Sequence, residues 1–146
     1  MHGGPIKMSV IASERIKRND GLNWQPSEEQ EQMAVIEWRN LMVARFPELR
    51  LLIHIGNGEW RHPATAAKLK RMGVHPGVSD LFLPVARGGW HGLWIEMKRR
   101  KGGRLSDDQK AWIDDMTEQH YMAVRADGAE EACDVIYRYL TEEVEQ

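Results

Sequence analysis

The sequence predicts an α/β fold in which a mixed β-sheet is flanked by helices. Two apolar stretches at residues 77–84 and 93–98, separated by a short glycine-rich segment, are typical of an antiparallel hairpin of buried strands. A helical stretch and a further strand follow, and a strand–helix–strand crossover joins parallel strands. A hairpin followed by such a crossover produces a mixed sheet with helices packed against it.

Composition is that of one soluble globular domain. The chain has 146 residues, 42% of them hydrophobic and 29% charged, so it is long enough to bury a core. Its apolar runs are far too short to cross a bilayer. Because Cys133 is the single cysteine, an internal disulfide and a thiolate zinc site are excluded, and we expect an intracellular, reducing compartment.

The chain divides into two segments. Residues 1–26 combine mixed charge with several Gly and Pro and show little periodicity, which predicts a partly flexible N-terminal arm. The start of this arm lacks the apolar core of a secretory signal. Residues 27–146 carry the periodic stretches and are expected to form the folded domain.

The first helix is predicted from residue 28. Ser27 follows Pro26 and can cap the helix, and Gln30 stands at the capping-box position. Apolar residues then recur at helical spacings until Pro47 ends the helix. The expected core positions are Met33, Val35, Ile36, Trp38, Leu41, Met42 and Phe46.

A strand and a short helix are expected next. Residues 49–55 are apolar with β-branched members and predict a strand that leads into a turn at 56–58. Residues 63–72 predict a short helix, with Pro63 in its first turn and Gly73 at its end. Three basic side chains on this helix are expected to contact nucleic-acid phosphates. They are Lys68, Lys70 and Arg71.

Three ionisable residues interrupt the apolar hairpin. Side chains alternate along a strand, so Glu96 and Lys98 share one face, and pairing through the loop at 86–92 brings Asp80 alongside Glu96. Two carboxylates and an ammonium group suit metal-assisted phosphodiester hydrolysis, because Mg²⁺ prefers oxygen ligands and a lysine can stabilise developing charge. In the alternative interpretation, Asp80 forms a turn and Glu96 with Lys98 belongs to an exposed strand face.

Charge is distributed unevenly along the chain. Residues 61–104 contain ten Lys or Arg and two acids, Asp80 and Glu96, a local balance of +8. The net charge is −2, so the remainder of the chain carries −10. A basic segment whose two acids are the candidate metal ligands indicates a phosphate-binding face, although a charge run can also be solvated surface.

The chain after Lys98 continues with a basic, glycine-containing loop that is expected to bind a phosphate backbone. Its basic residues are Arg99, Arg100, Lys101 and Arg104. Ser106 and Gln109 form a capping box at the start of the next helix. Residues 121–125 predict the last strand, and residues 128–140 an amphipathic helix in which Cys133 is a packing residue.

The hairpin residues match a known signature. Asp80, fifteen further residues and then Glu96-x-Lys98 resemble the spaced motif of the PD-(D/E)xK nuclease superfamily, with Ser79 where Pro is usual. Four segments closely resemble the VRR-NUC domain: residues 66–73, 76–83, 89–98 and 103–112. The resemblance covers about residues 27–140 and is to the stand-alone form found in phages and bacteria.

This resemblance implies a restriction-endonuclease-like core and a Mg²⁺-dependent DNA endonuclease, with Mn²⁺ able to substitute. The catalytic residues implied are Asp80, Glu96, Lys98 and Gln109. The first two of these would bind the metal together with an acid of the first helix. Glu28, with Gln32 one turn further along the helix, best matches the family's Glu-x-x-x-Gln pattern. Glu37 is the alternative candidate for this metal ligand.

Similar stand-alone domains form homodimers that cut branched DNA, including four-way junctions. The resemblance therefore implies a homodimer that resolves Holliday junctions in the cytoplasm of a bacterium or phage-infected host. Broader cleavage of flaps or single strands is one alternative, and a nucleic-acid-binding module without catalysis is another. No P-loop is present, so ATP is not expected, and no membrane partner is expected either.

Overall fold

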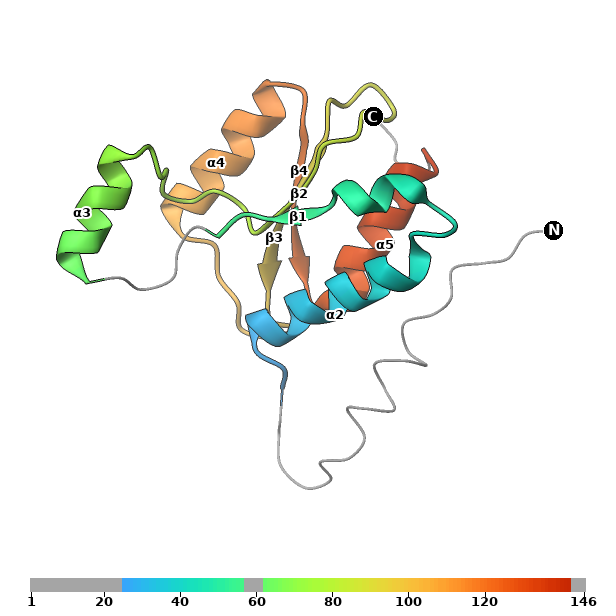
Figure 1. The fold of residues 1–146 in the computed structure, drawn as a ribbon, viewed down its shortest axis with the longest axis horizontal. Coiled ribbons are helices and arrows are strands. Elements are labelled where there is room, and N and C mark those ends of the chain that lie inside the picture. Colours follow the sequence, from blue (N-terminus) through green and yellow to red (C-terminus); the bar gives the residue numbers. More distant parts are fainter. Residues whose placement is uncertain (1–24, 57–61, 143–146) are drawn as a thin grey trace.

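The computed structural model describes residues 25–56 and 62–142, which form a sheet with strand order β1-β2-β3-β4 (Figure 1). β1 (Ile53–His54), β2 (Leu81–Leu83) and β3 (Leu93–Lys98) are antiparallel neighbours, whereas β4 (Met122–Asp127) runs parallel to β3. The predicted α/β class with a mixed sheet is confirmed. Most of the expected arm, and most of the turn expected at 56–58, lie outside the described residues.

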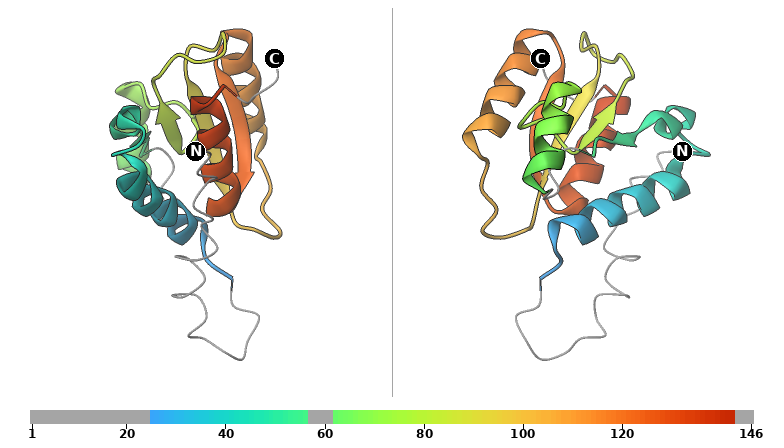
Figure 2. Two further views of the ribbon diagram at one scale, coloured as in Figure 1. Left: turned by 90° about the vertical axis from the view of Figure 1, so that its right-hand side faces the viewer. Right: turned by 60° about the vertical axis from the view of Figure 1, so that its left-hand side comes forward.

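Helices cover both faces of the sheet. α2 (Glu28–Met42) and α5 (Ala129–Leu140) lie on one face, and α4 (Asp107–Glu118) lies on the other (Figures 1 and 2). α3 (Pro63–Arg71) stands apart from these layers and contains no buried residue. The three basic side chains of α3 are consequently all exposed.

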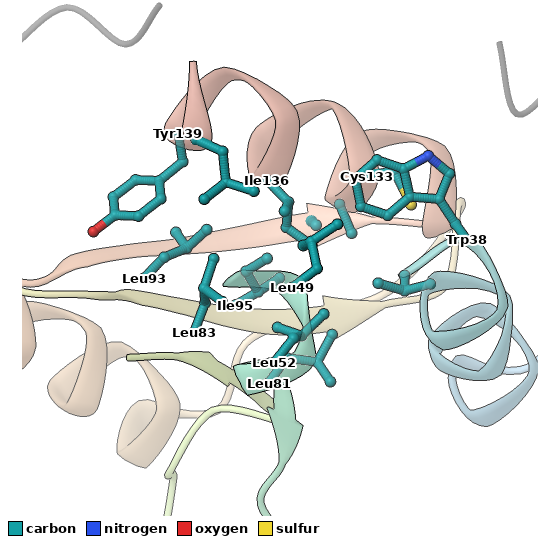
Figure 3. Close-up of a cluster of buried hydrophobic side chains, with 14 of the residues drawn as sticks. Trp38, Leu49, Leu52, Leu81, Leu83, Leu93, Ile95, Cys133, Ile136 and Tyr139 are labelled. Atoms are coloured by element: carbon teal, nitrogen blue, oxygen red, sulfur yellow. The ribbon is translucent and has the colours of Figure 1, made fainter. Parts of the chain in front are cut away.

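The core lies between the sheet and the pair α2 and α5. Figure 3 shows Leu83, Leu93 and Ile95 on the side of the strands that faces Ile136 and Tyr139 of α5, and all five are almost completely buried. Because side chains alternate along a strand, the even-numbered residues of β3 face the opposite side. The packing of the core therefore fixes which face carries the charged residues of the hairpin.

The first helix is shorter than expected, because it ends at Met42 and not near Pro47. Its capping box between Ser27 and Gln30 is present as predicted. The expectation that Met33 and Leu41 belong to the core was wrong, since they are 57% and 59% exposed. The buried stripe consists of Glu31, Val35, Trp38 and Met42 at spacings of four and three. At about 100° per residue, Met33 lies on the opposite side of the helix from this stripe and Leu41 lies about a quarter turn from it.

The strand expected at residues 49–55 is mostly a 3₁₀ helix, η1 (Pro47–Leu51), and only Ile53–His54 pair with β2. Proline at the first position of η1 favours a helical turn. Leu49 and Leu52 are both buried, and a three-residue spacing places them on one side of a 3₁₀ turn but on opposite faces of a strand.

The other predicted elements agree with the structure within a few residues at each end. Cys133 is buried in the core, and burial raises the pKa of its thiol, which fits the predicted packing role. None of the helices in the described ranges has the length and apolar character that crossing a bilayer requires.

Candidate active site

The antiparallel register of β2 and β3 brings the two strand carboxylates together. Leu81 pairs with Ile95, so the preceding residue, Asp80, comes opposite Glu96. Asp80 Oδ2 accepts a hydrogen bond of 2.8 Å from the backbone amide of Met97, which holds this carboxylate against β3.

Glu96 and Lys98 are buried side chains on the same face of β3, with 2% and 5% exposure. Lys98 Nζ lies 3.2 Å from Glu96 Oε1, and Gln109 Nε2 donates to the same oxygen at 2.7 Å. The second oxygen, Oε2, is buried and has no hydrogen-bond partner among the described residues. One oxygen of Glu96 is thus held by two donors, while the other is an acceptor without a donor.

Burial, followed by the neighbouring carboxylate of Asp80, raises the pKa of Glu96 from 4.5 to about 7 against the opposing effect of Lys98. Both causes penalise the charged form of the carboxyl group. A cation bound between the two carboxylates would reverse the repulsion and favour the charged form. The site therefore has the electrostatics of a cation-binding carboxylate pair.

Gln109 is oriented by the capping box of α4. Its backbone amide donates to Ser106 Oγ at 3.2 Å, and its Oε1 accepts from the Ser106 amide at 2.9 Å. With the amide oxygen used in the cap, Nε2 is the end that reaches Glu96. Gln109 thus combines its place in the cap with a direct contact to Glu96, on the oxygen that Lys98 also approaches.

Gly77 couples the loop before Asp80 to the start of α4. This glycine has φ +82°, and a Cβ atom built on it would collide with the backbone of Asp108 and Gln109. Only a residue without a side chain can adopt this conformation and approach a helix backbone so closely. The carboxylate on β2 and the amide on α4 are therefore placed relative to each other by one backbone contact.

Of the two candidate helix acids, Glu28 lies beside the site. Glu28 Oε1 is 3.8 Å from Lys98 Nζ, and the side chain is 47% exposed. Glu37 is exposed and stands nine residues further along α2, roughly 13 Å along a helix axis. The geometry therefore favours Glu28, whose carboxylate contacts the ammonium group of Lys98.

Two residues near the site have roles that the sequence did not reveal. His54 Nδ1 lies 2.8 Å from the carbonyl oxygen of Asp80, a contact that depends on the register of β1. Glu31 is only 1% exposed, although it is a charged residue in the first turn of α2. The spacing from Glu31 to Val35 and Trp38 is the signal that could have placed it on the buried stripe.

The predicted phosphate contacts fall on two elements. Lys68, Lys70 and Arg71 are exposed on α3, and the other basic residues lie on the loop after β3. This loop and the start of α2 enclose a groove of about 500 Å³, next to Lys98. The groove is lined by Ser27, Glu28, Glu29, Arg99, Gly102, Gly103 and Arg104.

The residues present fit a hard divalent cation. Asp80 and Glu96 offer carboxylate oxygens, including the unpartnered Oε2, and Mg²⁺ is usually held by one or two carboxylates with water and phosphate oxygens. Across the two described ranges, no group of three or more His, Cys, Asp or Glu side chains is arranged to hold a metal ion. The protein ligands offered are therefore the carboxylate pair, with Glu28 nearby.

Fold and site together define an α/β protein with a restriction-endonuclease-like core. The sequence model of the VRR-NUC domain matches residues 11–135, so the chain belongs to the VRR-NUC domain family, a family of nucleases whose partner is DNA. A solved structure named "VRR_NUC domain protein" is similar, with a TM-score of 0.69 and 31% sequence identity over 81% of this chain and 91% of that one. No curated protein matches the chain.

Proposed function

We propose that this chain is a Mg²⁺-dependent DNA endonuclease, with Mn²⁺ able to replace Mg²⁺ and residues 27–146 as its nuclease domain. The observation that carries the proposal is the convergence of Asp80, Glu96 and Lys98 on one face of the sheet, with Glu96 Oε2 buried and unpartnered. Membership of a nuclease family supports a phosphodiester substrate.

In this proposal Asp80 and Glu96 hold the metal, and Glu28 contributes from α2. A metal held there would supply two effects, a lower pKa for a bound water and neutralisation of charge on the phosphate. Gln109 keeps the carboxylate of Glu96 in place through its 2.7 Å hydrogen bond. Lys98, held 3.2 Å from Glu96, orients the attacking water or stabilises the charge that develops on the phosphate.

Exposed basic side chains bind the DNA backbone on either side of the reacting phosphate. Neutralising phosphates releases counterions, so the affinity for DNA falls as salt concentration rises. The proposed contacts are Arg99, Arg100, Lys101 and Arg104 on the loop after β3 and Lys68, Lys70 and Arg71 on α3.

We further propose selectivity for branched DNA and resolution of Holliday junctions by a homodimer. Two symmetric cuts in a junction require two active sites related by a dyad, and one chain of this length carries one site. Trp90, in the loop between β2 and β3, is half-buried against the core, and we propose it as an interface residue because aromatic side chains are enriched at interfaces. Light scattering at micromolar concentration tests the dimer, and a strict monomer both free and on junction DNA would redirect the specificity to flaps or single strands.

A metal-titrated nicking assay on plasmid DNA, synthetic four-way junctions, flaps and single strands tests the activity. We expect cleavage that requires Mg²⁺, stops with EDTA and is abolished by Asp80→Asn, because loss of one ligand removes the metal's several kcal/mol of stabilisation. Asp134→Asn, on the exposed surface of α5, is the matched control for the loss of one carboxylate. DNA binding that needs no metal and leads to no cleavage would identify a binding module. Cleavage by the Asp80→Asn variant at the wild-type rate would rule out the proposed active site.

A further inference from the structure

Glu31 is a buried carboxylate that joins three elements next to the proposed active site. It belongs to the first turn of α2, one turn after Glu28, and is 1% exposed. Its Oε1 accepts from Arg100 Nε at 2.7 Å, and its Oε2 accepts from the amide of Ala129, the first residue of α5, at 2.8 Å. Both oxygens are therefore used, one by the loop after β3 and one by the start of α5.

Arg100 is held at two points of its side chain, the aliphatic stem and Nε. Its aliphatic stem packs so closely on Gly128 that a Cβ atom there would lie 2.9 Å from Arg100 Cγ. The amide of Gly128 in turn donates to the carbonyl of Lys98 at 2.9 Å. Although its Nε is bound to Glu31, the Arg100 side chain is 44% exposed. An arginine has five N–H donors, and the ones that are not on Nε lie on the two Nη atoms, where they can bind a ligand.

Among the basic side chains of this loop, Arg100 is the one that forms an ion pair with a buried carboxylate in the described structure. The loop backbone is held separately. Gln25 exchanges two hydrogen bonds with the backbone of Lys101, and Arg125 Nη2 donates to the carbonyl of Gly103 at 2.9 Å. An arginine held before its ligand arrives loses less side-chain entropy on binding, and its planar fork suits a phosphate.

We propose that Glu31 is a positioning residue that acts through Arg100, holding the guanidinium group so that it receives a DNA phosphate beside Lys98. The proposal rests on the proposed nuclease function, because it assumes a DNA substrate at this site. It differs from a purely structural role, in which Glu31 would do no more than accept the hydrogen bond from the amide at the start of α5. In a structural role, the effect of losing Glu31 would not depend on Arg100.

A double-mutant cycle in DNA affinity separates the two roles. Dissociation constants would be measured by fluorescence anisotropy on a labelled four-way junction in EDTA, where no cleavage occurs, for Glu31→Gln, Arg100→Ala and the double variant. We expect Glu31→Gln to raise Kd roughly fivefold in the wild-type background and by less than about 1.5-fold once Arg100 is absent. Arg100→Ala should also lower the salt slope of binding by about 1.

Single-turnover cleavage and two control variants complete the test. Glu31→Gln should keep its cleavage rate at saturating DNA within about twofold, because the proposal places its effect on binding. Asp134→Asn and Arg138→Ala remove the same charges from an exposed ion pair of 3.1 Å on α5 and should leave Kd unchanged. Arg100→Lys keeps the positive charge but lacks the Nε donor that binds Glu31, so it should weaken DNA binding as Glu31→Gln does. It therefore tests the positioning role even if Glu31→Gln does not fold.

Equal effects of Glu31→Gln with and without Arg100, or full affinity in Arg100→Lys, would overturn the inference while leaving the nuclease proposal intact. A wild-type protein that neither binds nor cuts any of the DNA substrates would overturn both.

Discussion

Replacing Glu96 by glutamine should change how the stability of this protein depends on pH. The carboxyl group is 2% exposed, and burial beside Asp80 raises its pKa from 4.5 to about 7. Glutamine is neutral at every pH and keeps an oxygen that can accept from Gln109. In the absence of metal, Glu96→Gln is therefore a permanent version of the protonated carboxyl group.

The sign and size of the effect follow from linkage between proton binding and folding. Between pH 4.5 and 7 the folded protein holds a proton at Glu96 that the unfolded chain has released, so the stability of the wild type falls as pH rises through this window. A tenfold change in proton affinity corresponds to about 1.4 kcal/mol, so the fall amounts to roughly 3 kcal/mol. The variant lacks this fall. An amide in place of the carboxyl group adds a cost that does not depend on pH, so the informative quantity is how the difference in unfolding free energy between the two proteins changes with pH.

Urea unfolding in EDTA at pH 4.5, 6 and 7.5 measures this quantity. We expect the free energy of unfolding of Glu96→Gln, relative to wild type, to rise by roughly 3 kcal/mol across the range. Glu118→Gln removes an exposed carboxylate at the end of α4 and controls for the loss of one negative charge. Mg²⁺ added at pH 7.5 should stabilise the wild type and not the variant. Parallel pH profiles for wild type and Glu96→Gln would refute the reasoning.

Three further predictions concern neighbouring residues. Gly77→Ala should lower the free energy of unfolding by roughly 1–3 kcal/mol and slow cleavage, because the added Cβ collides with Asp108 at the start of α4. Thermal unfolding measures the loss of stability, and nicking rates measure the loss of activity. Ser79→Ala should lower the free energy of unfolding by less than about 1 kcal/mol or raise it, because the buried Oγ of Ser79 has no hydrogen-bond partner in the described structure. A large loss of stability in urea unfolding would contradict this. Lys98→Ala should lower kcat far more than it weakens DNA affinity, whereas Arg99→Ala should raise KM in a salt-dependent way. If Lys98→Ala changed KM alone, that lysine would be assigned to phosphate binding.

Local patterns in the sequence were sufficient for much of the fold. The capping boxes at Ser27 and Ser106 marked the starts of two helices, because such caps depend on residues three positions apart. The apolar stretch at residues 93–98 coincides with β3, and alternation along a strand placed Glu96 and Lys98 on one face. Where a helix and a strand both suited a short apolar stretch, as at residues 49–55, local pattern failed, since burial of Leu49 and Leu52 was decided by distant contacts.

By itself, the sequence determined the order of elements apart from η1, the α/β class and the candidate charged residues, since these follow from patterns within a few positions of the chain. Only the tertiary structure decided which oxygen of Glu96 is occupied, that Glu28 and not Glu37 lies beside Lys98, and that Glu31 is buried against Arg100. These facts depend on strand register and on helices that meet across the fold, where Glu31 and Arg100 are in contact although they are 69 positions apart in the sequence. The electrostatics of the site, including the raised pKa of Glu96, arise from that burial, because desolvation exists only once the chain is packed.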